Sequence, residues 1–174
     1  MDEITISIFG SGKTEPEEPV FELAYQLGSL LAKAGFVIVN GGYGGTMTAA
    51  AKGARDAGGK VIGVTCSAFG QTGANPYISE VIVTHSLEER LDRLIQLGDA
   101  YIVLPGSTGT LLELAMVWEL KNKGFLDKKK TLILLGKYWQ PLVDLIDLED
   151  PGSKKNLTLV STPEEVIQYL LKTL

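Results

Sequence analysis

The chain has 174 residues, of which 45% are hydrophobic, so it is long enough to bury the core of one compact domain. Its 21 acidic and 16 basic residues leave a formal net charge of -5, which argues against nucleic acid as a partner but not against small anions. With one cysteine, no signal-like leader and no apolar run of membrane-spanning length, we expect a single cytoplasmic domain over residues 1–174 with no membrane partner.

Short β-rich runs alternate with helical patterns along the whole chain. The runs that we predict as strands are 4–9, 36–39, 61–65, 81–83, 101–104, 131–135 and 157–160. The predicted helices lie at about 21–34 and 47–57, around Trp118, and from Ser86 and Thr162 onward, whereas the charged stretch 121–130 is predicted as a solvated loop. Because parallel strands require crossover helices, we predict a Rossmann-like α/β domain of three layers with a mostly parallel sheet of about seven strands.

The first predicted strand is followed by a Gly-Ser-Gly turn at 10–12 and then by Lys13, which looks like the end of an ATP-binding P-loop. A P-loop requires a glycine four residues before its Gly-Lys pair and a helix directly after it. Ser7, inside the strand, stands where that glycine is needed, and Pro16 and Pro19 delay the next helix. We therefore interpret this turn as something other than a triphosphatase loop.

Two more glycine-rich segments follow predicted strands, NGGYGGT at 40–46 and LPGSTGTLLE at 104–113. In a parallel sheet, ligands bind where strands end and helices begin, and the free amides at a helix start favour phosphate. The dinucleotide fingerprint G-x-G-x-x-G is not met, because its third glycine is replaced by Glu15 or Met47, so a phosphorylated ligand of mononucleotide size is favoured. The predicted binding residues are Gly10, Ser11, Gly42, Gly44, Gly45, Thr46, Gly106, Ser107, Thr108, Gly109 and Thr110.

These segments resemble the Lonely Guy family, long labelled possible lysine decarboxylases, whose signature is P-G-G-x-G-T-x-x-E. The signature stands here as PGSTGTLLE, from Pro105 to Glu113, and the resemblance extends to IFGSG, GGYGGTM, AGGKVIGV and Arg90. It implies a Rossmann-like protein, usually dimeric, that hydrolyses the N-glycosidic bond of nucleoside 5′-monophosphates such as AMP and cytokinin forms, and releases base and ribose 5-phosphate. It also implies that Arg90 and Glu113 are the catalytic pair.

A carboxylate at Glu113 suits this reaction, because it can stabilise positive charge on the sugar and orient or deprotonate water. We expect the helix dipole to favour the ionised form of Glu113, which fits a base or electrostatic stabiliser better than an acid. Arg90 offers a guanidinium fork for phosphate or other ligand oxygens, or it belongs to an exposed capping region. No cofactor is expected, and no metal either, because one histidine and one cysteine do not make a structural zinc site.

Departures from the family pattern, including a GGYGGTM turn about one residue shorter than in the plant enzymes, leave the function open. Ser107 replaces the second glycine of the signature, and the usual Met-His-x-Arg-Lys segment around Arg90 reads LEERL. These changes favour, as the alternative, a non-catalytic carrier or sensor, such as the molybdenum-cofactor carrier proteins that bind a phosphorylated pterin. We also expect a homodimer, from the resemblance and from apolar residues on the helices 86–98 and 111–120 that exceed what one sheet face needs, namely Leu94, Leu97, Met116, Val117 and Trp118.

Overall fold

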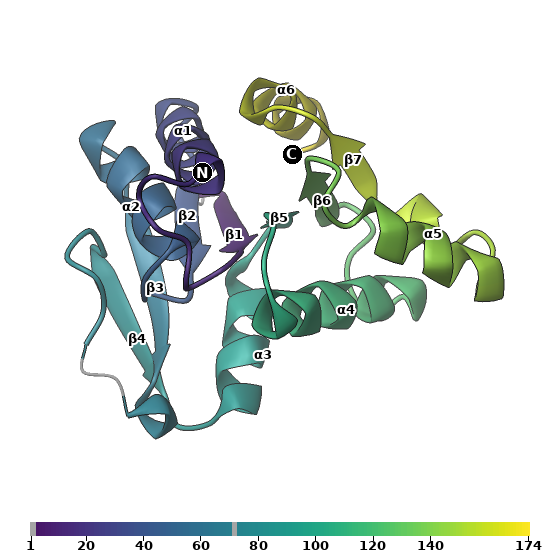
Figure 1. The fold of residues 1–174 in the computed structure, drawn as a ribbon, viewed down its shortest axis with the longest axis horizontal. Coiled ribbons are helices and arrows are strands. Elements are labelled where there is room, and N and C mark those ends of the chain that lie inside the picture. Colours follow the sequence, from purple (N-terminus) through teal and green to yellow (C-terminus); the bar gives the residue numbers. More distant parts are fainter. Residues whose placement is uncertain (1–2, 71–72) are drawn as a thin grey trace.

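The computed structural model describes residues 3–70 and 73–174 and has seven strands in one parallel sheet (Figure 1). The strands are β1 (Thr5–Phe9), β2 (Val37–Asn40), β3 (Val61–Cys66), β4 (Glu80–Thr84), β5 (Ala100–Val103), β6 (Thr131–Leu135) and β7 (Thr158–Val160), in the order β4-β3-β2-β1-β5-β6-β7. Each predicted strand coincides with an observed one to within one residue at either end. The predicted Rossmann-like fold class is confirmed.

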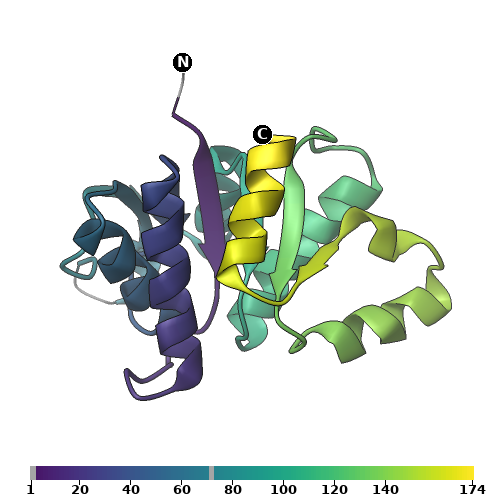
Figure 2. The same ribbon diagram turned by 90° about the horizontal axis from the view of Figure 1, so that it is seen from above.

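Helices cover both faces of this sheet (Figures 1 and 2). They are α1 (Pro19–Lys33), α2 (Thr46–Asp56), α3 (Leu87–Leu97), α4 (Thr108–Asn122), α5 (Gln140–Glu149) and α6 (Pro163–Thr173), with 3₁₀ turns at Ser67–Phe69 and Ser153–Asn156. In Figure 1, α1, α2 and α6 lie above the sheet, α3 and α4 lie below it, and α5 lies at the edge beside β7. None of the helices described at 3–70 and 73–174 is long and apolar enough to cross a membrane.

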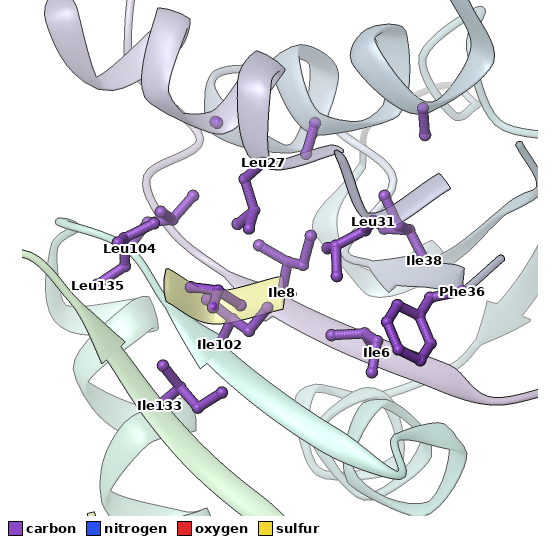
Figure 3. Close-up of a cluster of buried hydrophobic side chains, with 14 of the residues drawn as sticks. Ile6, Ile8, Leu27, Leu31, Phe36, Ile38, Ile102, Leu104, Ile133 and Leu135 are labelled. Carbon is purple, nitrogen blue, oxygen red and sulfur yellow. The ribbon is translucent and has the colours of Figure 1, made fainter. Parts of the chain in front are cut away.

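The central strands are buried because each face of the sheet packs against helices, whereas the edge strands β4 and β7 are partly exposed. Along β1, Ile6 and Ile8 point toward α1 in the cluster that Figure 3 shows, whereas Phe9 belongs to the second cluster under α3 and α4. Ser7 pairs in register with Val39 of β2 and Tyr101 of β5. This central position of β1 fixes where its C-terminal turn meets the turns of its two neighbours.

Helices α1 and α2 approach each other closely through glycine. A Cβ built on Gly28 of α1 would lie 2.1 Å from the carbonyl oxygen of Ala50, and one on Gly53 of α2 would lie 2.0 Å from that of Tyr25. Only glycine at both positions lets the two backbones come this near. The contact holds the start of α2, and therefore the preceding glycine-rich turn, next to β1.

The charged stretch 121–130 is less solvated than predicted. Helix α4 continues to Asn122, and the ammonium groups of Lys121 and Lys130 donate to the carbonyls of Lys130 and Gly98. Burial lowers the pKa of Lys121. The aliphatic parts of these two lysines therefore help to close the end of the domain, and only part of the stretch behaves as a free loop.

Candidate functional site

The three predicted glycine-rich turns meet at the C-terminal edge of β2, β1 and β5. The strand order reverses between β1 and β5, and such a switch point is where open α/β sheets bind ligands. A cavity of about 300 Å³ opens there. Its lining residues are Gly10, Gly12, Lys13, Tyr43, Gly44, Met47, Phe69, Arg90, Ser107, Gly109, Thr110 and Glu113.

The turn after β1 is tied to the start of α2. The amide and the hydroxyl of Thr46 both donate to the carbonyl of Ser11, at 2.9 and 3.1 Å. A Cβ on Gly10 would lie 2.4 Å from the Thr46 hydroxyl oxygen, so the two segments touch. Thr46 and Ser11 therefore join two turns, and the Thr46 amide is not the free phosphate donor that its position before a helix had suggested.

The turn after β2 is shaped by glycines with positive φ. Gly42 has φ of 77° and Gly45 has φ of 61°, a region that other residues rarely adopt. The Asn40 side chain accepts from the Gly42 amide at 2.8 Å and donates to the carbonyl of Met47 at 3.0 Å. Of the predicted glycines in this turn, Gly44 lines the cavity, whereas Gly42 and Gly45 give the turn its shape.

The turn after β5 leads into α4, whose N-cap is Ser107. The first amides of a helix have no partner within it, so Thr108, Gly109 and Thr110 present N–H groups at this end. Ser107, Gly109 and Thr110 line the cavity. Gly106 does not, because it is packed against the Thr110 side chain, where a Cβ would lie 2.2 Å from the hydroxyl oxygen.

Arg90 is buried, with 8% of its surface exposed, although the sequence left open an exposed capping role. Its Nε donates to the Val64 carbonyl at 2.8 Å and its Nη2 to the Gly41 carbonyl at 3.1 Å. The guanidinium carbon lies 5.5 Å from the ring centroids of both Tyr43 and Phe69. The capping role belongs to Ser86 instead, whose hydroxyl accepts from the amide of Glu89 at 3.1 Å.

Glu113 faces this arginine, with Oε1 4.0 Å from Nη1 of Arg90 and 14% of its side chain exposed. Burial raises the pKa of Glu113 to about 7, although the positive charge of Arg90 opposes the shift. The expected preference for the ionised form is therefore wrong. Helix α4 begins at Thr108, so Glu113 lies beyond the first turn, where the helix dipole has little effect. Near neutral pH both forms of Glu113 are populated, and the group can accept or donate a proton.

A second cavity, of about 270 Å³, borders the same pair. It shares Arg90, Gly109 and Glu113 with the first cavity. Its remaining lining residues are Leu87, Leu91, Thr108 and Leu112. The Arg90–Glu113 pair thus borders both a polar cavity, lined largely by glycines and charged residues, and an apolar cavity, lined by leucines.

Several lining residues were not among the predicted site residues. Lys13 follows the Gly-Ser-Gly turn and Tyr43 lies inside the NGGYGGT segment, so the sequence placed both next to predicted residues. Phe69 comes from the 3₁₀ turn after β3, and no motif marks it. Within residues 3–70 and 73–174, no three His, Cys, Asp or Glu side chains lie close enough to hold a metal ion.

Sequence relatives of the chain include enzymes. The cytokinin riboside 5′-monophosphate phosphoribohydrolase of Mycobacterium tuberculosis is 33% identical over 131 residues, which cover 74% of this chain and 70% of that protein. The enzyme of the same name from Rhodococcoides fascians is 33% identical over 129 residues, which cover 72% of this chain and 65% of that protein, slightly less than two thirds. An uncharacterized protein of Archaeoglobus fulgidus is 29% identical over 168 residues and matches 97% of this chain and 95% of its own length.

Solved structures share the complete fold. The molybdenum cofactor binding protein of Rippkaea orientalis has a TM-score of 0.81 and 28% identity, over 99% of this chain and 98% of that one. The molybdenum cofactor carrier protein of Chlamydomonas reinhardtii has a TM-score of 0.79 at 23% identity, over the same shares, and is a likeness of fold alone. The model of the SLOG cluster4 family matches residues 3–167. The chain therefore belongs to the SLOG cluster4 family, a divergent Lonely Guy-like branch, in agreement with the motifs of its sequence.

Proposed function

We propose that the protein hydrolyses the N-glycosidic bond of a nucleoside 5′-monophosphate, such as AMP or a cytokinin riboside monophosphate, to the free base and ribose 5-phosphate. The observation that carries this proposal is the position of Glu113, which lines both the polar and the apolar cavity. The phosphoribohydrolases among its relatives support it.

The two cavities suit the two halves of such a substrate. Amides at the start of α4 favour the phosphate of the ribosyl half, and the leucine-lined cavity offers apolar space to the departing base. The ribose C1′ would then lie near Glu113. As the C–N bond breaks, positive charge develops on the sugar, and an ionised carboxylate stabilises it.

The same carboxylate can complete the proton balance. Ionised Glu113 accepts a proton from the attacking water, whose oxygen bonds to C1′, and returns that proton to the nitrogen of the leaving base. A pKa of about 7 suits a group that has to do both near neutral pH. Arg90 lies 4.0 Å away and keeps part of the ionised population that burial would otherwise remove.

The test is Glu113→Gln, which keeps the size of the side chain and removes its charge. We expect turnover of the accepted monophosphate to fall on the order of 100- to 1000-fold, as is common when one electrostatic group is lost. The affinity for ribose 5-phosphate should change far less. Turnover is measured by chromatography of the free base across a panel of nucleoside 5′-monophosphates. Undiminished hydrolysis by Glu113→Gln would show that this carboxylate is not the catalytic one.

A non-catalytic carrier or sensor is the second candidate, and the fold comparison favours it. The molybdenum cofactor binding protein of Rippkaea orientalis shares the fold over 99% of this chain with a TM-score of 0.81. A carrier would release no base from any monophosphate and would retain a phosphorylated pterin through purification. Mass spectrometry of the ligand released from denatured protein, together with the turnover panel, separates the two candidates.

A further inference from the structure

A phosphate dianion in the polar cavity is neutralised only if cationic side chains can approach it. The charged side chains that line the cavity are Lys13, Arg90 and Glu113. When Glu113 is ionised, the two cations leave a net charge of only +1. Whichever cation is able to approach the phosphoryl group therefore decides how tightly it binds.

Arg90 is poorly placed for this role. Two of its nitrogens already donate to the carbonyls of Val64 and Gly41, and the guanidinium carbon lies 5.5 Å from the ring centroids of the neighbouring Tyr43 and Phe69. Its remaining nitrogen, Nη1, faces Glu113. A two-pronged contact through Nε and Nη2 would break the bonds to the buried Val64 and Gly41 carbonyls, which costs the desolvation free energy of each, and a contact through Nη1 would bring the phosphate against the Glu113 carboxylate.

Lys13 has the opposite properties. The main chain of its turn is fixed, because the Lys13 amide donates to the Ser11 hydroxyl at 3.1 Å and Ser11 in turn accepts from Thr46. The side chain is exposed at the wall of the cavity and, among residues 3–70 and 73–174, makes no ion pair. An ammonium group on a flexible stem above a fixed turn can follow a phosphate without disturbing the fold.

The amide donors point to the same location. The Thr46 amide is engaged by Ser11, whereas the amides at the start of α4, from Thr108 to Thr110, have no partner within the helix. Lys13 and Thr110 line the same cavity. We propose that Lys13 is the phosphate-binding cation of this site and that it holds the phosphoryl group of the ligand against the N-terminus of α4. This inference rests on the proposed use of the cavity by a phosphorylated ligand, but not on hydrolysis.

Binding measurements with three variants test this proposal. Lys13→Ala should weaken the binding of AMP and of ribose 5-phosphate about 10- to 100-fold in calorimetric titrations, because a charge-assisted contact is lost. The binding of adenosine, which has no phosphate, should stay the same. Lys13→Arg should restore most of the affinity for AMP. The matched control is Lys33→Ala, an exposed lysine in the last turn of α1, at the opposite edge of the sheet, which should change neither ligand.

The failure of this proposal differs from the failure of the proposed function. If Lys13→Ala binds AMP and adenosine in the same ratio as the unaltered protein, Lys13 does not bind the phosphoryl group. If the unaltered protein binds neither AMP nor ribose 5-phosphate, the proposal is also wrong. If the unaltered protein binds AMP through Lys13 but releases no adenine, the inference stands and only the hydrolase proposal falls.

Discussion

Two features of its surroundings act in opposite directions on the pKa of Glu113, namely burial and a neighbouring arginine. Burial disfavours the carboxylate and raises its pKa to about 7, and Arg90 only reduces that shift. The sequence shows that a glutamate lies near a helix start, but it does not show how much solvent reaches the side chain. Burial determines the direction of the pKa shift of Glu113. Arg90 of α3, a helix that precedes Glu113 in the sequence, packs beside the carboxyl group.

The raised pKa predicts how stability depends on pH. An unfolded glutamate titrates near pH 4.5, so between about pH 4.5 and 7 the folded protein binds a proton that the unfolded chain has released. The stabilising contribution of protonated Glu113 is complete below pH 4.5 and is lost as the pH rises through 7. We expect this loss to reach about 3 kcal/mol.

Urea denaturation at pH 5 and pH 8 measures this effect. The free energy of unfolding should fall from pH 5 to pH 8 by about 2.5 kcal/mol more in the unaltered protein than in Glu113→Gln, which has no carboxyl group at this position. The difference between the two proteins isolates Glu113 from all other titrating groups. Equal pH dependence of the two proteins would mean that Glu113 titrates normally.

Gly109 provides a prediction that separates folding from binding. A Cβ at this position meets no atom within 4 Å, and Gly109 lines both cavities. Gly109→Val should therefore fold with little change in stability, while its side chain occupies ligand space beside the amides at the start of α4. We expect binding of nucleoside monophosphate to be abolished and the thermal midpoint to shift by only a few degrees. A variant that binds AMP normally would show that ligand does not approach Gly109.

The strands were predictable to within one residue because each is a short run rich in apolar or β-branched residues between turn residues, and the five central strands are buried on both faces. Helix α5 has no counterpart among the predicted helices. Only Val143 of this helix is buried, and Leu145 and Leu148 are exposed, so its pattern shows no clear apolar stripe. The three phosphate-site turns were recognisable as glycine-rich segments, but which glycines face the ligand and which shape the turn depends on contacts between turns.

The close contact between α1 and α2 changes the expected effect of replacing a helical glycine with alanine. Replacing glycine with alanine inside a helix usually stabilises it by about 1 kcal/mol. At Gly28 the added methyl would lie 2.1 Å from the Ala50 carbonyl oxygen, so the helices must separate. We expect Gly28→Ala to destabilise the protein by about 1–3 kcal/mol.

Chemical denaturation of two matched variants checks this prediction. Gly109→Ala introduces the same methyl group into α4, where no atom lies within 4 Å, and should be neutral or stabilising. The two substitutions should therefore shift the free energy of unfolding in opposite directions, or at least differ by more than 1 kcal/mol. If Gly28→Ala is as stable as Gly109→Ala, the close helix contact does not limit stability.

In the whole molecule, the candidate site lies near an apolar surface that the domain itself does not cover. The sequence predicts a dimer from uncovered apolar residues on the helices 86–98 and 111–120. This argument is partly wrong, because Leu94, Val117 and Trp118 are buried inside the chain. The leucines that do reach the surface are Leu87, which is 43% exposed, and Leu112, which is 41% exposed. Both line the apolar cavity beside Glu113. A partner on this face would exclude water from the carboxyl group.

We therefore predict a homodimer that contacts through α3 and α4 around Leu112. Leu112→Glu places a charge in that contact, and light scattering at micromolar concentration should change from the mass of two chains to that of one. Leu171→Glu is the matched control, since Leu171 is 64% exposed on α6, on the other face of the sheet, and the dimer should persist. A monomeric unaltered protein would contradict the dimer itself. A dimer that survives Leu112→Glu would place the contact elsewhere on the surface.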